Sequence, residues 1–95
     1  MEKNTIIKQR FCISIPEGLH LRPAAILAKT ADGFNSTITV CCNGSEAEAK
    51  SVLSLILLEA SYGNEITVIA KGPDAVYAMA AIEKCLRRDS VNTTP

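Results

Sequence analysis

The dipeptide Asn43-Gly44 constrains the fold more than any other feature, because it separates two segments whose side chains alternate. Residues 36–42 precede the dipeptide and residues 45–49 follow it. Each segment has one apolar face: Ile38, Val40 and Cys42 in the first, Ala47 and Ala49 in the second. Asn-Gly adopts the positive φ angles of a two-residue turn that matches the twist of paired strands. We therefore expect an antiparallel hairpin.

Two further segments alternate in the same way, residues 10–15 and residues 65–70. Their inward faces are Phe11, Ile13 and Ile15 in the first segment, and Ile66, Val68 and Ala70 in the second. Turn residues bound them, with Pro16-Glu17-Gly18 after the first and Tyr62-Gly63-Asn64 before the second. A period of two over this length indicates strands with one buried face.

Three segments have the helical period instead. Residues 21–31 form the first helix, and Gly33 should close it in a left-handed conformation. Ser51 is a suitable N-cap for a short helix over residues 52–59. Pro73 suits the first turn of a last helix that runs to Leu86. The apolar stripes are Ala24, Leu27, Ala28 and Ala31 in the first helix, and Ala75, Ala78, Met79, Ile82, Cys85 and Leu86 in the last.

The predicted element order is βαββαβα, which indicates an α+β fold. Strands with one apolar face need cover on one side only, so we expect an open-faced sandwich: a four-stranded antiparallel sheet with three helices on one face. The 95 residues suffice for a single domain, 1–95. Its core should span about residues 10–86, with flexible ends at 1–8 and 87–95.

The charge balance and the apolar runs argue against two classes of partner. Lys+Arg and Asp+Glu each number 10, so the chain lacks the basic excess of a nucleic-acid binder. The longest apolar run, residues 55–58, is far too short for membrane insertion. The N-terminal residues do not resemble a secretory signal, so we expect a cytoplasmic protein.

The four cysteines are better explained as core or surface residues of a reduced protein than as metal ligands. They are Cys12, Cys41, Cys42 and Cys85. None forms a Cys-x-x-Cys pair, and the single histidine does not stand at a distance along the chain that is typical of metal ligands. We therefore expect no metal. A metal-handling ferredoxin-like domain would share this element order, but it would need paired ligands.

His20, the single histidine, stands where the first helix is expected to begin. A helix N-terminus presents unpaired amides and a positive dipole end that favour an anion. Arg22 adds a guanidinium suited to phosphate, and Pro23 gives up an amide that has no helical partner. An imidazole nitrogen is a nucleophile near neutral pH. These residues suit a phosphorylated histidine, although a lone histidine near a helix start is more often a polar cap or a surface residue; no catalytic triad is possible with a single histidine.

Residues 18–25 read Gly-Leu-His-Leu-Arg-Pro-Ala-Ala, and with this motif the chain resembles the HPr family, the histidine-containing phosphocarriers of the phosphoenolpyruvate-dependent sugar phosphotransferase system. The similarity runs without gaps from about residue 10 to residue 86. It also includes Gly33-Phe34, Ile38-Thr39-Val40, Asn43-Gly44, the sequence Ala-Glu-Ala-Lys-Ser at 47–51, and Gly63.

The resemblance implies a stoichiometric carrier without a cofactor rather than an enzyme. His20 would accept a phosphoryl group on Nδ1 from phospho-Enzyme I and pass it to IIA proteins, with Arg22 steadying the group. The protein would act as a monomer. Ser51 stands where many relatives are phosphorylated by HPr kinase/phosphorylase, although a plain N-cap serine is the alternative.

The short helix carries more apolar residues than one buried stripe can hold. Leu55 and Leu58 are needed inside, so the surplus should form a docking patch beside His20. Leu57 belongs to the same surplus, and the residues expected to dock partners are Leu21, Val52, Leu53 and Ile56. The alternative is that this short helix is more deeply buried, so that the surplus apolar residues also lie in the core.

Three departures from the common HPr pattern keep other functions open. Leu21 is bulky where many relatives have a small or hydroxyl residue, and Asp32 and Ser54 replace lysines of some relatives. Residues 46–49 and Gly72-Pro73 are similar to the nitrogen-related paralogue, NPr, whose phosphorelay is regulatory. A regulatory binding module that acts through Ser51 is a further alternative.

Overall fold

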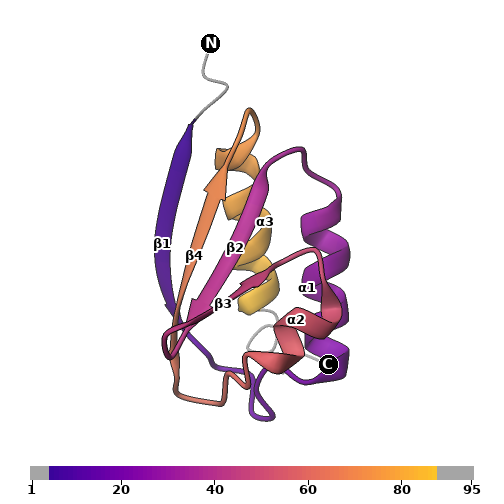
Figure 1. Ribbon diagram of the computed structural model, residues 1–95, viewed down its shortest axis with the longest axis vertical. Helices are drawn as coiled ribbons and strands as arrows, with labels where there is room; N and C mark the ends of the chain where they lie inside the picture. The colour runs from indigo at the N-terminus through magenta and orange to yellow at the C-terminus, as the bar shows by residue number, and fades with distance from the viewer. Residues whose placement is uncertain (1–4, 88–95) are drawn as a thin grey trace.

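A computed structural model describes residues 5–87 of the chain. Its elements follow the order βαββαβα, as the sequence predicts. They are β1 (Ile6–Cys12), α1 (Leu21–Asp32), β2 (Thr37–Cys42), β3 (Ser45–Glu48), α2 (Val52–Leu57), β4 (Glu65–Lys71) and α3 (Ala75–Leu86). Figure 1 shows α1 and α3 running alongside the long strands, with α2 at the end of the molecule where α1 begins.

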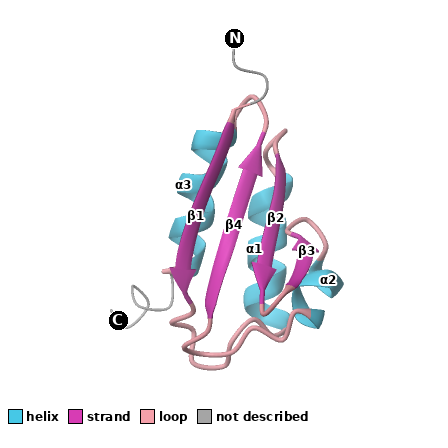
Figure 2. Cartoon of the chain, turned by 60° about the vertical axis from the view of Figure 1, so that its left-hand side comes forward, coloured by secondary structure: helices cyan, strands magenta, loops and turns pink. Residues whose placement is uncertain are grey.

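The four strands form one sheet in the order β1-β4-β2-β3, and every neighbouring pair is antiparallel. The expected hairpin joins β2 to β3, with Cys42 opposite Ser45. Asn43 and Gly44 have φ angles of 52° and 82°, as a two-residue turn of this kind requires. Figure 2 shows all three helices behind the sheet, so the open-faced sandwich is confirmed.

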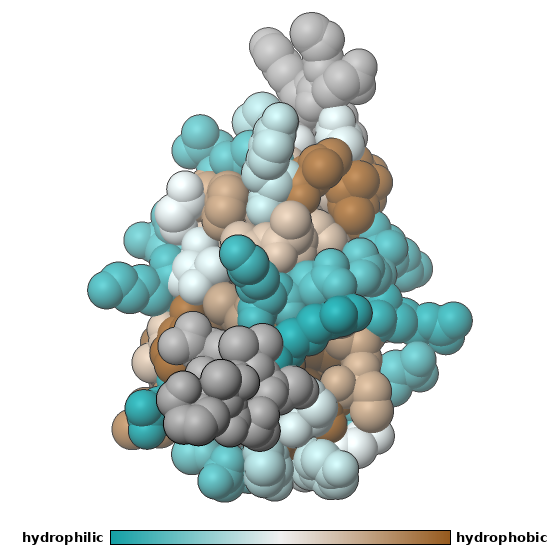
Figure 3. Space-filling view, turned by 180° about the vertical axis from the view of Figure 1, so that it is seen from behind, coloured by the Kyte–Doolittle hydropathy of each residue, from teal (hydrophilic) through white to brown (hydrophobic). Residues whose placement is uncertain are grey.

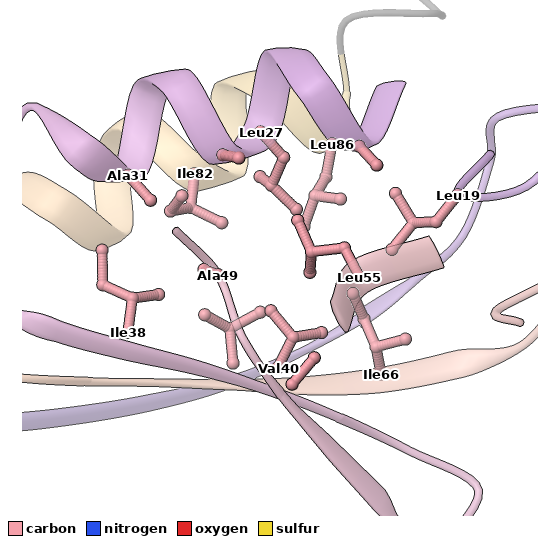
Figure 4. Packing of buried hydrophobic residues seen from close by; sticks show 14 of the residues in the cluster. Leu19, Leu27, Ala31, Ile38, Val40, Ala49, Leu55, Ile66, Ile82 and Leu86 are labelled. Atoms are coloured by element: carbon pink, nitrogen blue, oxygen red, sulfur yellow. The ribbon is translucent and has the colours of Figure 1, made fainter. Parts of the chain in front are cut away.

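The core lies between the sheet and the helices, and the predicted alternation decides which side chains reach it. Figure 4 shows side chains from β2 and β4 pointing toward those of α1 and α3. The predicted stripes of both long helices are buried apart from Cys85, which is partly exposed. Cys41 and Cys42 lie on opposite faces of β2, and burial raises the pKa of both thiols.

The first strand begins earlier than the sequence analysis predicts. It starts at Ile6 and pairs along its full length with β4, so residues 6–8 are ordered strand rather than part of a flexible end. At the other end, Arg87 caps α3 through its amide, which donates to Glu83 O at 3.1 Å. The remaining parts of both expected flexible ends, residues 1–4 and 88–95, lie outside the described residues.

Two helix boundaries differ in detail from their predictions. Gly33 has a φ of −78°, so α1 ends without a left-handed residue. The helix closes instead with two hydrogen bonds that each span three residues, from Gly33 N to Thr30 O and from Phe34 N to Ala31 O. The left-handed residue follows α2, where Glu59 has a φ of 54° and the helix ends at Leu57. Pro73 lies just outside α3, whose N-cap is Asp74.

Asp74 joins the start of α3 to the segment that leads into β2. Its Oδ1 accepts a hydrogen bond from Ser36 Oγ at 2.6 Å, and its Oδ2 accepts one from Asn35 N at 2.9 Å. Ser36 is fully buried, so its hydroxyl needs this partner. The hydrogen bond from Ser36, followed by that from Asn35, lowers the pKa of the Asp74 carboxyl.

Candidate functional site

His20 is the residue that immediately precedes α1. Its backbone is extended, with φ −92° and ψ −166°, and its carbonyl accepts from Ala24 N at 2.9 Å. Its amide donates to Gly18 O at 3.0 Å, and its side chain makes no capping hydrogen bond. The imidazole therefore projects from the helix start instead of serving as a cap, and half of its surface is exposed.

The loop before His20 is fixed by the segment that follows α2. Leu19 N donates to Ala60 O at 2.9 Å, and the backbone at Gly18 packs against the same carbonyl. A Cβ at position 18 would lie 2.5 Å from Ala60 O, and Gly18 has a φ of 77°. Only glycine satisfies both conditions, so the Gly-Leu-His order sets the position of the imidazole.

The first turn of α1 offers the amides that an anion site needs. Within residues 5–87, the amides of Leu21 and Arg22 donate no hydrogen bond, and Pro23 has no amide to satisfy. Free amides at a helix N-terminus, together with the positive dipole end, favour an anion beside His20.

A pocket of about 300 Å³ opens between the start of α1 and the end of α3. Its polar rim consists of Glu17, His20 and Arg22. Its remaining lining is mainly apolar: Ile15, Leu19, Pro23, Ile26, Leu27, Cys85 and Leu86. His20 and Arg22, predicted to act together, therefore line one pocket, and the guanidinium can face a group carried on the imidazole.

Glu17 belongs to this site, although the sequence analysis assigns it only to a loop. Its Oε1 lies 3.9 Å from Nε2 of His20. Glu17 precedes His20 by three residues, but such spacing brings side chains together only when the backbone between them has the right geometry. That geometry depends on the contact with Ala60.

Ser51 has the local structure predicted for it. Its Oγ accepts a hydrogen bond from Ser54 N at 3.2 Å, and its carbonyl accepts one from Leu55 N at 3.1 Å. Ser51 is therefore the N-cap of α2 and is partly exposed. The N-cap interpretation holds whether or not the hydroxyl is also modified.

The apolar patch differs in composition from its prediction. Leu21 and Leu53 are each 65% exposed, as expected of docking residues. Val52 and Ile56 instead pack partly against the core, because they flank the buried Leu55 stripe. Leu57, at 69% exposed, supplies more free apolar surface than either.

A second apolar area lies away from His20. Figure 3 shows a brown area at the upper end of the molecule, where β1 starts. Ile6 and Val76 are exposed, and Gly72 N donates to Thr5 O, so the starts of β1 and α3 lie together. Because α1 begins at the opposite end, this area is separate from the surface around His20.

No described helix is long and apolar enough to cross a membrane. Over the same residues, 5–87, no group of histidine, cysteine, aspartate and glutamate side chains is arranged to hold a metal ion.

Comparison with known proteins places this geometry in a family. Residues 7–88 match the family model PTS-HPr, described as the PTS HPr component phosphorylation site. The phosphocarrier protein HPr of Mycoplasma capricolum is 41% identical over 69 residues, which cover 73% of this chain and 78% of that protein. The HPr of Mycoplasma genitalium is 40% identical over 80 residues, which cover 83% of this chain and 91% of that protein.

Solved structures agree with the sequence relatives. A histidine-containing phosphocarrier protein from Mycoplasma superimposes with a TM-score of 0.85 at 36% identity and covers 88% of this chain and 96% of its own. A structure of an HPr dimer from Thermoanaerobacter tengcongensis has a TM-score of 0.70 at 35% identity and covers 76% of this chain and 83% of its own.

Fold and site together define a small open-faced α+β sandwich with an exposed histidine at a helix N-terminus. Residues 5–87 present that histidine beside free amides and an arginine. The chain belongs to the HPr family, the phosphocarriers of the phosphotransferase system.

Proposed function

We propose that His20 accepts a phosphoryl group from phospho-Enzyme I and passes it to IIA proteins. The observation that carries this proposal is the placement of an exposed imidazole beside the free amides of Leu21 and Arg22, within the described part of the chain. An exposed site suits a carrier, because two different partners must reach the same nitrogen in turn.

The transfer step requires a nucleophile and a place for the phosphoryl oxygens. Nδ1 of His20 uses its lone pair to form an N–P bond while the N–P bond of the donor phosphohistidine breaks. The amides of Leu21 and Arg22 and the Arg22 guanidinium then bind the oxygens. Transfer to a IIA histidine is the same step in reverse, so the carrier is regenerated and not consumed.

The proposal is tested by incubating the protein with Enzyme I and phosphoenolpyruvate. Mass spectrometry should show the gain of one phosphoryl group that is lost in acid, as expected of a phosphorus–nitrogen bond. His20→Ala should show no gain, while Cys85→Ser, a change at another pocket residue, should retain it. Absence of labelling in the wild type by a cognate Enzyme I would refute the proposal.

Ser51 is proposed as a regulatory site for HPr kinase/phosphorylase. Its hydroxyl is partly exposed at the start of α2, where a phosphate would meet the positive end of the helix. The exposed Leu53 and Leu57 on the same helix would lie beside the modified residue. Phosphorylation here would therefore change the charge of a surface that partners use.

The remaining choice is between a sugar relay and an NPr-type regulatory relay. The exposed pair Glu46 and Glu48 on β3 matches the part of the sequence that is similar to NPr. Parallel labelling with a sugar-type and a nitrogen-type Enzyme I would separate these functions, because each donor should load its own carrier faster.

A further inference from the structure

Glu17 sits in a turn whose backbone is fixed on both sides. Gly18 N donates to Ile15 O at 2.9 Å and closes the turn, in which Pro16 and Glu17 are the central residues. Pro16 sets its own φ, which suits the first central position of such a turn. The turn therefore fixes the backbone of Glu17 three residues before His20, from where its carboxylate can reach the imidazole.

The carboxylate approaches one particular nitrogen. Oε1 of Glu17 lies 3.9 Å from Nε2 of His20, and both residues line the rim of the same pocket. A carboxylate that faces one ring nitrogen favours the neutral tautomer in which that nitrogen carries the proton. We infer that Glu17 is a positioning residue, which holds the proton on Nε2 and leaves the lone pair on Nδ1.

This inference rests on the proposed phosphoryl transfer and adds a step to its chemistry. When Nδ1 forms the N–P bond, Nε2 keeps its proton, so the ring becomes positively charged. That charge faces the Glu17 carboxylate, while the phosphoryl oxygens face the amides of α1. The side chains of Glu17 and His20 are 66% and 50% exposed, so the ion pair is worth a modest, about two- to fivefold effect on the phosphorylation equilibrium.

The test combines a spectroscopic measurement with a transfer assay. Nitrogen-15 NMR of the unphosphorylated protein, recorded in alkaline solution with a neutral imidazole, reports which ring nitrogen carries the proton. We expect the proton on Nε2 in the wild type and a shift toward Nδ1 in Glu17→Gln. Glu17→Asp, which keeps a carboxylate, should recover part of the Nε2 form. Glu48→Gln, which removes the same charge on β3, should change nothing.

The transfer assay measures the fraction phosphorylated at equilibrium with Enzyme I and phosphoenolpyruvate. Glu17→Gln should lower the equilibrium constant about two- to fivefold. Equal tautomer ratios in the wild type and Glu17→Gln would overturn the inference, as would a shifted ratio with an unchanged equilibrium constant. A wild type that takes no phosphoryl group, together with a shifted ratio, would refute the proposed function and leave the tautomer assignment standing.

Discussion

At the scale of single residues, Gly18 does more for the site than its lack of a side chain suggests. It provides a left-handed backbone and also the space in which Ala60 O approaches. These two roles can be separated because Gly44, with a φ of 82°, has no atom near its added Cβ within the described residues. The two glycines therefore form a matched pair.

Gly18→Ala should destabilise the protein more than Gly44→Ala. The second change costs only the left-handed conformation, about 1–2 kcal/mol, whereas the first adds a clash with backbone that cannot move without disturbing His20. Urea denaturation of both variants measures the difference. Equal losses would show that the contact with Ala60 does not constrain the loop. Phosphorylation of His20 should also be slower in Gly18→Ala, because the imidazole is displaced.

At the scale of elements, α2 is the helix most dependent on its cap. It has six residues, too few to be stable without side-chain help. Ser51→Ala should lower the free energy of unfolding by about 1 kcal/mol, because Ser54 N loses its acceptor. Ser51→Asp should retain most of the stability. Ser54→Ala is the control, since only the backbone of Ser54 takes part in the cap; an equal loss there would contradict the assignment.

The hydrogen bonds of Asp74, which join the start of α3 to the segment before β2, should make the stability of the fold depend on pH. Hydrogen bonds from Ser36 and Asn35 lower the pKa of the Asp74 carboxyl in the folded protein. The ionised carboxylate therefore stabilises the fold fully at pH values above the unfolded pKa of about 3.9. This stabilisation is lost as the pH falls through the lower, folded pKa. Unfolding midpoints in urea between pH 7 and pH 3 should therefore decline less steeply in Asp74→Asn than in the wild type. Asp32→Asn, outside this network, should keep the wild-type slope; parallel curves for all three proteins would argue against the role of Asp74.

At the scale of the whole molecule, the features that could be predicted from the sequence are those that depend on residues close together along the chain. The hairpin at Asn43-Gly44, the buried stripes of α1 and α3 and the cap at Ser51 all follow from nearby residues, and so does the position of His20 at the start of α1. The start of β1 does not, because Ile7 and Gln9 share one face but differ in polarity, and the segment becomes a strand by pairing with β4. Glu17 was missed for a related reason, since its approach to His20 depends on the backbone at Gly18 and Leu19, which contacts the distant Ala60.

The hydrogen bond from Leu19 to Ala60 has a consequence for the order of folding. It joins two loops that are far apart along the chain, so it requires closure of a long segment, and the entropy of that closure must be offset by other contacts. The imidazole is present from the moment of synthesis, but its surroundings are complete only when the sheet and α2 have assembled. Under the proposed function, an incompletely folded chain would offer Enzyme I no finished site and would not divert phosphoryl groups from the native carrier.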